Sequence, residues 1–283
     1  MVNNSNGRLV KPQSIFKATA TNHLSYKGVA DYARSRNFYM DLLGMKCTYD
    51  DGERCSVSFG DPERSIYIWS GESKPYVDHF AFSIADFGLE GVKAELEKWG
   101  FEPEDDGDYA WTIWDPDGYK VQICAERGVF PGAARPGATT EGKIPTGEAG
   151  QHPGVFQATA VNHIAYRVPD HARSRNFYMD LFGMRLAFED GKKCSVAFGQ
   201  PEDAIYIVAT KSPNDGATVD HLAFSIANFD LKAVGEKLRN QGHESEDDGD
   251  YARTIWDPDG YKIQICAEAG VYPGARQDPH HNR

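Results

Sequence analysis

The amino-acid sequence predicts an α+β fold made of four βαβββ modules, arranged as two tandem domains. A chain of 283 residues corresponds to about two domains of ordinary size. Its two halves repeat one another, because residues 16–134 align with residues 156–276 and about 71 of 106 aligned pairs are identical. A period of about 140 residues is too long for a solenoid and indicates two whole domains. Within each half, a strand, a helix and three strands follow one another twice.

Hydrophobic periodicity and turn residues place the elements of the first half. Helical spacing over residues 31–43 and 89–99 ends in each case at a glycine, Gly44 or Gly100. Alternation and short apolar runs predict strands at 22–26, 47–49, 55–59, 66–69, 77–84, 109–114 and 119–125. The last two strands are joined by the turn Asp115-Pro-Asp-Gly118, in which proline presets the backbone and glycine accepts a positive φ. The second half repeats this order.

The segments outside the repeat set the expected domain boundaries. Between Arg135 and Gly154 the chain holds five glycines and three prolines without apolar periodicity, which is typical of an extended linker. We therefore expect an N-terminal extension (1–15), a first domain (16–134), a linker (135–155), a second domain (156–276) and a disordered tail (277–283).

The composition excludes several function classes. The chain carries 42 acidic and 30 basic side chains, a net charge of −12 and a pI near 5.2, which opposes binding to nucleic acids and anionic membranes. No apolar run approaches the roughly 18 residues of a membrane span, and the polar start does not resemble a secretory signal. Five cysteines without a CxxC pair favour the reducing cytoplasm. We expect a small-molecule substrate as partner and leave a homodimer open.

The histidines point to a metal site. Of nine histidines, four occupy equivalent places in the repeat, namely His23, His79, His163 and His221. Strand alternation places Phe80 and Phe82 on one face and His79 on the other, beside small residues. The same rule puts Gln122 opposite Val121 and Ile123, and puts Asn22 and Leu24 opposite His23. Two histidines and an amide oxygen on one concave face form a plausible site for a borderline divalent metal.

Taken together, these features resemble the vicinal oxygen chelate superfamily. The residues that carry the resemblance are Asn-His23, the segment ARSRNFYMDLLGM at 33–45, Asp-His79 and the segment DPDGYKVQ at 115–122. The superfamily contains glyoxalase I, methylmalonyl-CoA epimerase, fosfomycin-resistance transferases, extradiol dioxygenases and bleomycin-resistance proteins. The resemblance implies that modules pair into cups, each around one metal. The implied ligands are His23, His79 and Gln122, and again His163, His221 and Gln264.

The chain departs from the family pattern at two ligand positions. The last ligand of family enzymes is usually Glu, where this chain has Gln122 and Gln264, and the fourth position of glyoxalase and epimerase aligns with Tyr67 and Tyr206. Both glyoxalase carboxylates are therefore absent, and an amide cannot accept a proton near neutral pH. Tyr67 and Tyr206 are candidate hydrogen-bond donors or acid/base groups, with packed aromatic side chains as the alternative. Tyr109 and Tyr251 are two further candidate catalytic residues, which we expect to line an aromatic pocket.

The favoured function is a non-haem Fe(II) dioxygenase of the ring-cleaving type, acting on a small catechol- or enol-like substrate. Three protein ligands leave open positions for a bidentate substrate, and a neutral Gln leaves the charge of the ion to attract an anionic chelator. Mn, Ni, Co or Zn are the alternative metals. A glyoxalase- or epimerase-like lyase or isomerase and a non-catalytic binding or resistance protein are the alternative functions. The sequence does not decide whether modules pair within or between domains.

Three weaker features complete the interpretation. The acidic loops 102–108 and 244–250 lack the ligand series of a calcium loop, so we expect solvated turns that hold much of the charge away from the candidate ligands. Trp111 against Arg253 is the main difference expected near the site, so the two cups are expected to prefer different substrates. The arginines at the start of the first helix of each half are assigned to a solvated face or to inter-domain ion pairs; they are Arg34, Arg36, Arg173 and Arg175.

Overall fold

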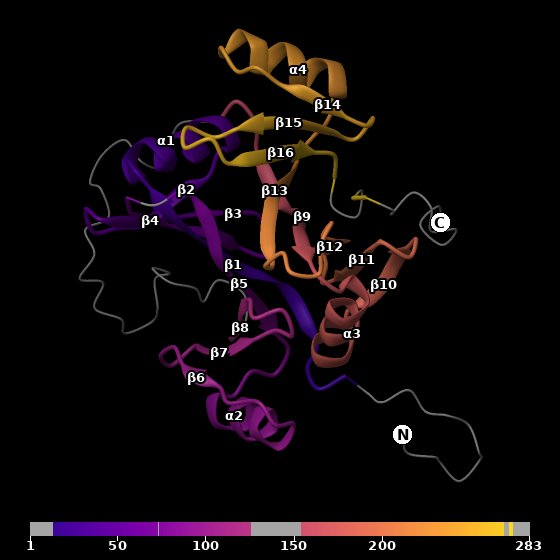
Figure 1. Cartoon of the computed structure of the whole chain (residues 1–283). Coiled ribbons are helices and arrows are strands. Elements are labelled where there is room, and N and C mark those ends of the chain that lie inside the picture. The colour runs from indigo at the N-terminus through magenta and orange to yellow at the C-terminus, as the bar shows by residue number, and fades with distance from the viewer. Residues whose placement is uncertain (1–13, 73, 126–153, 269–271, 274–283) are drawn as a thin grey trace.

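A computed structural model describes residues 14–72, 74–125, 154–268 and 272–273 (Figure 1). Most of the expected N-terminal extension and linker, and the whole of the expected tail, lie outside these residues. Within them the fold is α+β, as the sequence predicts, with two eight-stranded mixed sheets and four helices. The helices are α1 (Tyr32–Leu43), α2 (Leu89–Lys98), α3 (His171–Phe182) and α4 (Leu231–Asn240).

Each domain builds one sheet from its own two modules. The first sheet has the order β2-β3-β4-β1-β5-β8-β7-β6 and the second the order β10-β11-β12-β9-β13-β16-β15-β14. The strands of the first sheet are β1 (Ala18–Val29), β2 (Lys46–Asp50), β3 (Arg54–Phe59), β4 (Arg64–Ser70), β5 (Tyr76–Ile84), β6 (Glu104–Asp105), β7 (Ala110–Trp114) and β8 (Lys120–Cys124). Those of the second sheet are β9 (Ala158–Val168), β10 (Arg185–Glu189), β11 (Lys193–Phe198), β12 (Asp203–Ala209), β13 (Thr218–Ile226), β14 (Glu246–Asp248), β15 (Ala252–Trp256) and β16 (Lys262–Cys266). The modules therefore pair within domains, through β1 with β5 and β9 with β13.

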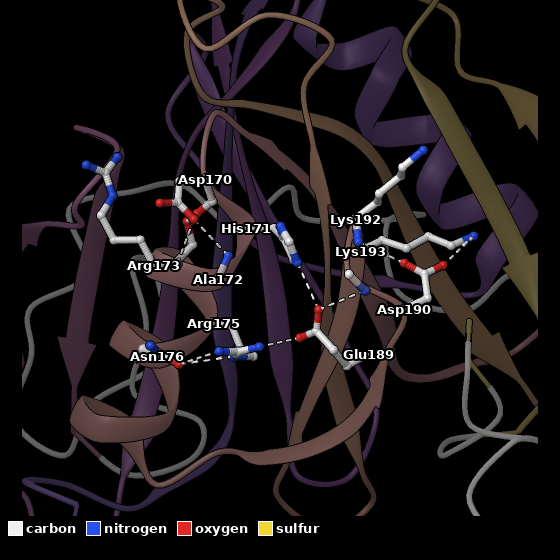
Figure 2. Close-up of polar contacts among 12 residues, drawn as sticks. Asp170, His171, Ala172, Arg173, Arg175, Asn176, Glu189, Asp190, Lys192 and Lys193 are labelled. Atoms are coloured by element: carbon white, nitrogen blue, oxygen red, sulfur yellow. Dashed lines mark hydrogen bonds and ion pairs between the residues drawn. The ribbon is translucent and has the colours of Figure 1, made fainter.

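Local chemistry explains where the first helix of each domain begins and ends. The Asp31 side chain accepts from the backbone of Arg34 at the start of α1, and Gly44 ends the helix with φ 63°, a value that glycine adopts without strain. At the start of α3, Asp170 caps the helix, and Glu189 of β10 accepts from His171 and Arg175 (Figure 2). Because Glu189 reaches two turns of α3, it fixes the helix against its own sheet.

The apolar faces of the two sheets and their first helices pack against one another in a single hydrophobic core. The rings of Phe80 on β5 and Tyr178 on α3 lie 6.1 Å apart, and those of Tyr39 on α1 and Phe224 on β13 lie 6.3 Å apart. Figure 1 shows the corresponding arrangement, with α1 next to the β15–β16 hairpin of the other domain. Each domain therefore completes the core of the other.

Two aspartates of the DPDG turns cross this interface. Asp257 accepts the hydroxyls of Tyr26 and Tyr39 at 2.8 and 3.1 Å. Its counterpart Asp115 accepts those of Tyr166 and Tyr178 at 2.7 and 2.9 Å. Burial raises the pKa of both carboxyl groups against the opposing effect of these hydrogen bonds. The turn that the sequence identified as a hairpin connection is thus also an inter-domain contact.

The arginines at the start of α1 and α3 divide between two kinds of contact. Arg34 and Arg173 form ion pairs across the interface, with Asp259 and Asp117 respectively. The other two contact their own domains, Arg36 through Asp50 and Arg175 through Glu189. The inter-domain assignment is therefore correct for one arginine of each helix.

A buried ion pair lies at the centre of the interface. Arg64 of β4 and Asp203 of β12 are fully buried, and their guanidinium and carboxylate groups meet at 2.9 and 3.1 Å. These residues occupy the same position in the two copies of the repeat, offset by 139 residues.

In the part of the chain that the structure describes, no helix is long and apolar enough to cross a membrane.

Candidate metal centre

The histidines that the sequence selected meet in pairs, one pair in each domain. His23 on β1 and His79 on β5 lie on neighbouring antiparallel strands, and their Nε2 atoms are 3.1 Å apart. His163 on β9 and His221 on β13 repeat this arrangement, with Nε2 atoms again 3.1 Å apart. All four residues are at most 9% exposed. They lie on the face opposite Phe80 and its neighbours, as strand alternation predicts.

A β-bulge precedes each histidine of the first pair. Thr21 pairs with Phe82 and His23 with Ala81, so Asn22 is an extra residue on β1. Its side chain turns to the histidine face, where its Oδ1 lies 2.8 Å from Nδ1 of His23. The expectation that Asn22 points to the opposite face is wrong, because alternation is interrupted at the bulge.

The second bulge places a carboxylate beside the other imidazole. On β5, Asp78 is the extra residue, and its Oδ2 lies 2.8 Å from Nδ1 of His79. The second domain repeats both contacts, at 2.9 Å between Asn162 and His163 and 2.7 Å between Asp220 and His221. Each histidine therefore has an oxygen acceptor at Nδ1, supplied by the residue immediately before it. The repeated Asn-His and Asp-His dipeptides were the signal for these partners.

These acceptors fix the tautomers and direct two lone pairs at one point. With a proton on each Nδ1, both Nε2 atoms of His23 and His79 are unprotonated. Burial lowers the pKa of His23 well below its usual value, and the neighbouring His79 lowers it further, although the side chain of Gln122 opposes both effects. Burial also lowers the pKa of His79, although Asp78 opposes this effect. Both rings are therefore neutral at neutral pH, and their facing lone pairs suit a cation held between them.

The third predicted ligand is an amide oxygen with no hydrogen-bond partner. Gln122 on β8 pairs with Ala81, which pairs in turn with His23, so the glutamine lies one strand beyond the histidines. Its Oε1 atom is buried and no described residue donates to it. Its Nε2 atom donates to Asp106 and, at 3.2 Å, to Thr112. The amide is thereby oriented with its oxygen free.

The acidic loops have a different role from the one expected. The segments assigned to solvated turns contain the short strands β6 and β14, and Asp106 and Asp248 accept hydrogen bonds from Gln122 and Gln264. The expectation that these loops lie away from the candidate ligands is therefore wrong. Sequence patterning did not find this contact, because it joins residues 16 positions apart on two sides of a hairpin.

The second domain offers the same donor set. Gln264 donates through Nε2 to Asp248 and Thr254, and its buried Oε1 also lacks a partner among the described residues. Those residues contain no cluster of three His, Cys, Asp or Glu side chains that would suit a metal. Two imidazole nitrogens and one neutral amide oxygen are donors that suit a borderline first-row divalent ion.

The four candidate catalytic tyrosines lie on the histidine-bearing faces of the two sheets, but at different places on them. Tyr67 on β4 pairs with Ser25, and burial raises its pKa to about 12, so its hydroxyl stays protonated. The ring of Tyr206 lies 6.2 Å from the ring of His163. Tyr109 packs against the small residues around Cys124, and Tyr251 packs equivalently around Cys266.

The expectation that Trp111 and Arg253 make the two cups differ is wrong. Trp111 and Arg253 point to the helix side of each sheet, where their side chains donate to the backbone oxygens of Leu89 and Leu231 at 2.8 Å. The following threonines, Thr112 and Thr254, face the glutamines instead. The substitution at 111 and 253 therefore does not alter the cups.

The comparison with family models identifies the fold family. The Glyoxalase/Bleomycin resistance protein/Dioxygenase superfamily matches residues 160–265, which is nearly the whole second domain from β9 to β16. The first domain repeats this domain in sequence and in strand order. The second domain is similar to this superfamily over nearly its whole length. The resemblance and the fold class inferred from the sequence are thereby confirmed, whereas a search of curated protein sequences finds no match.

Solved structures share the tandem fold over nearly the whole chain. The 2,3-dioxygenase LapB from Pseudomonas sp. KL28 is 16% identical and aligns over 92% of this chain and 96% of its own, with a TM-score of 0.68. Homoprotocatechuate 2,3-dioxygenase from Brevibacterium fuscum, in complex with 3,4-dihydroxyphenylacetate, is 18% identical over 94% and 86%, with a TM-score of 0.66. The Mn(II)-bound glyoxalase from Novosphingobium aromaticivorans is 16% identical over 90% and 83%, with a TM-score of 0.65. At these identities the likeness is one of fold.

Proposed function

We propose that the protein is a metal-dependent dioxygenase that acts on a small chelating substrate of the catechol or enol type. The observation that carries this proposal is the pair of facing Nε2 atoms, 3.1 Å apart, each on a ring with an oxygen beside its Nδ1, next to a buried amide oxygen without a partner. The same set occurs in both domains. The residues that would hold the two ions are His23, His79 and Gln122, and His163, His221 and Gln264.

The chemistry of the donors favours a dioxygenase over a glyoxalase-like reaction. All three donors are neutral, so the charge of a divalent ion would be left to attract an anionic chelating substrate. Neither set contains a carboxylate donor that could move a proton, because the third donor of each set is a glutamine amide. When bound, Fe(II) supplies the redox chemistry with dioxygen that ring cleavage requires. The likeness to two ring-cleaving dioxygenases over more than 90% of the chain supports this choice.

The chain's own residues would orient the donors and the substrate. Asn22 and Asp78 hold the imidazoles of His23 and His79 in the tautomer that presents Nε2. The hydroxyl of Tyr67 stays protonated, because burial raises its pKa to about 12, and it can therefore donate to an anionic substrate oxygen. Its role is that of a hydrogen-bond donor rather than a base.

Removal of the carboxylate that orients Gln122 should weaken the first site. In Asp106→Ala the amide loses its acceptor and is free to rotate, so we expect metal affinity at that site to fall about 10–100-fold. Titration with Fe(II) under anaerobic conditions measures this change. Asp248→Ala should act equally on the second site, and Glu104→Gln, an exposed neighbour, should have no effect. Unchanged affinity in Asp106→Ala would show that this contact does not position a ligand.

Metal analysis combined with oxygen uptake tests the proposal as a whole. Protein purified anaerobically without chelators and reconstituted with Fe(II) should hold about two ions per chain, one for each donor set. It should then consume oxygen with a panel of catechols. Absence of stoichiometric metal would indicate a non-catalytic binding protein, and turnover with Mn(II) in strict anaerobiosis would indicate a lyase or isomerase. Either result would overturn the dioxygenase assignment.

A further inference from the structure

Three serine hydroxyls on the metal-site face of the first domain have no hydrogen-bond partner. Ser65 pairs with His23, Ser25 pairs with His79, and Ser56 pairs with Tyr67, so all three lie on one side of the candidate site. Each side chain is at most 1% exposed, and no described residue bonds to the three hydroxyl oxygens. A buried hydroxyl without a partner is costly, so these groups call for an explanation other than packing.

The second domain shows that the fold does not need these hydroxyls. The positions equivalent to Ser25 and Ser65 are Ala165 and Ala204, on strands of the same order and register. The third equivalent, Ser195, keeps its hydroxyl but donates it to the backbone oxygen of Pro273 at 2.6 Å. Because the two domains are near-copies, this comparison separates what the fold requires from what the first domain adds.

The chain itself covers the corresponding surface of the second domain. Tyr272 is 2% exposed and packs on Ala197 and Ala204, and its hydroxyl donates to Glu202 at 2.9 Å. In the first domain the equivalent glutamate, Glu63, accepts instead from Ser58 at 2.8 Å. A serine at position 204 would contact the ring of Tyr272. The first domain has serines, Ser58 and Ser65, at the positions equivalent to Ala197 and Ala204. The two cups therefore differ in polarity on the side formed by β3, β4 and β1 or their counterparts.

We propose that Ser25, Ser56 and Ser65 bind an anionic oxygen substituent, such as a carboxylate, on the ligand of the first cup. This inference rests on the proposed function for the chelating part of that ligand, whereas the serines recognise a second polar group beyond it. Hydroxyl donors bonded to a carboxylate contribute more than neutral pairs, and the buried setting strengthens each bond. The second cup, with alanines and Tyr272 in the same places, does not share this preference.

Two catechols that differ by a carboxylate test the proposal on the full chain. Anaerobic, Fe(II)-loaded protein is titrated calorimetrically with catechol and with 3,4-dihydroxyphenylacetate. In the variant Ser25→Ala/Ser65→Ala, affinity for the carboxylate-bearing probe should fall at least about tenfold, while affinity for catechol should change less than about twofold. Ser58→Ala is the matched control, because its hydroxyl is already bonded to Glu63, and it should leave both affinities unchanged.

A stability measurement separates recognition from a structural role. Because the hydroxyls lack partners, Ser25→Ala/Ser65→Ala should unfold at an equal or higher temperature than the unaltered chain. A lower unfolding temperature, or equal losses of affinity for both probes, would overturn the assignment. If neither probe binds the Fe(II)-loaded protein, both proposals fail. If only 3,4-dihydroxyphenylacetate binds, and binds metal-free protein equally well, the proposed function fails and the serine proposal stands provided that this binding requires the serines.

Discussion

Replacing Arg64 by methionine should lower the free energy of unfolding by about 3–5 kcal/mol, because it leaves the buried carboxylate of Asp203 without its partner. The guanidinium donates twice to Asp203 and once, at 2.8 Å, to the backbone oxygen of Pro62. Burial already raises the pKa of Asp203 despite the arginine, so the loss of Arg64 removes the main group that stabilises its charge. Chemical denaturation of the full chain measures the change.

A partly exposed arginine and a charge exchange provide the controls. Arg54→Met breaks a partly exposed pair with Asp51 and should cost less than about 1 kcal/mol. The exchange Arg64→Asp/Asp203→Arg should recover most of the stability that either single change loses, because the two residues hold equivalent places in the repeat. A loss in Arg64→Met no larger than in Arg54→Met would contradict the prediction.

The equivalence of these two positions bears on how the domains recognise one another. Two copies of the first domain in the same arrangement would bring two arginines together, and two copies of the second would bring together two aspartates. Like charges in a buried contact are strongly unfavourable. The pair therefore favours association of a first domain with a second domain, even though the two share about two thirds of their residues.

The elements and the ligand face could be predicted because they depend on local patterns. The helix expected at 31–43 is α1, with Asp31 as its cap and Gly44 at its end. Alternation along β5 placed Phe80 in the core and His79 on the opposite face. These signals need only the neighbours of each residue along the chain, and the repeat supplied each of them twice.

The partners of the ligands could not be predicted because they depend on irregular or distant contacts. A bulge turns Asn22 to the histidine face against simple alternation; the repeated Asn-His dipeptide is visible in the sequence, but nothing in it marks Asn22 as the extra residue of a bulge. Asp106 reaches Gln122 only after the hairpin closes, so composition alone suggested a solvated loop. The expectation that Trp111 lies near the site was wrong for a related reason, since its orientation depends on which face of β7 packs against α2.

Histidine removal in one domain should abolish one metal site and spare the other. His79→Ala deletes one of two nitrogens that converge on the first site, so metal affinity there should fall by more than about 100-fold, beyond the effect of removing an orienting partner. His221→Ala should do the same to the second site. Each variant should hold about one Fe(II) per chain after reconstitution, half the content of the unaltered protein, and the double variant should hold none.

The position of each pair explains why the two losses should be independent. His23 and His79 belong to the first sheet, and His163 and His221 to the second, with no residue shared between the pairs. The free-energy effects of mutations at sites that share no partner are additive. His243→Ala, which removes a histidine that contacts Phe38 outside both cups, is the control and should leave the metal content unchanged. If His79→Ala retained two ions per chain, the first donor set would not be a metal site, whereas a loss of both ions would show that the two cups are coupled through the shared core.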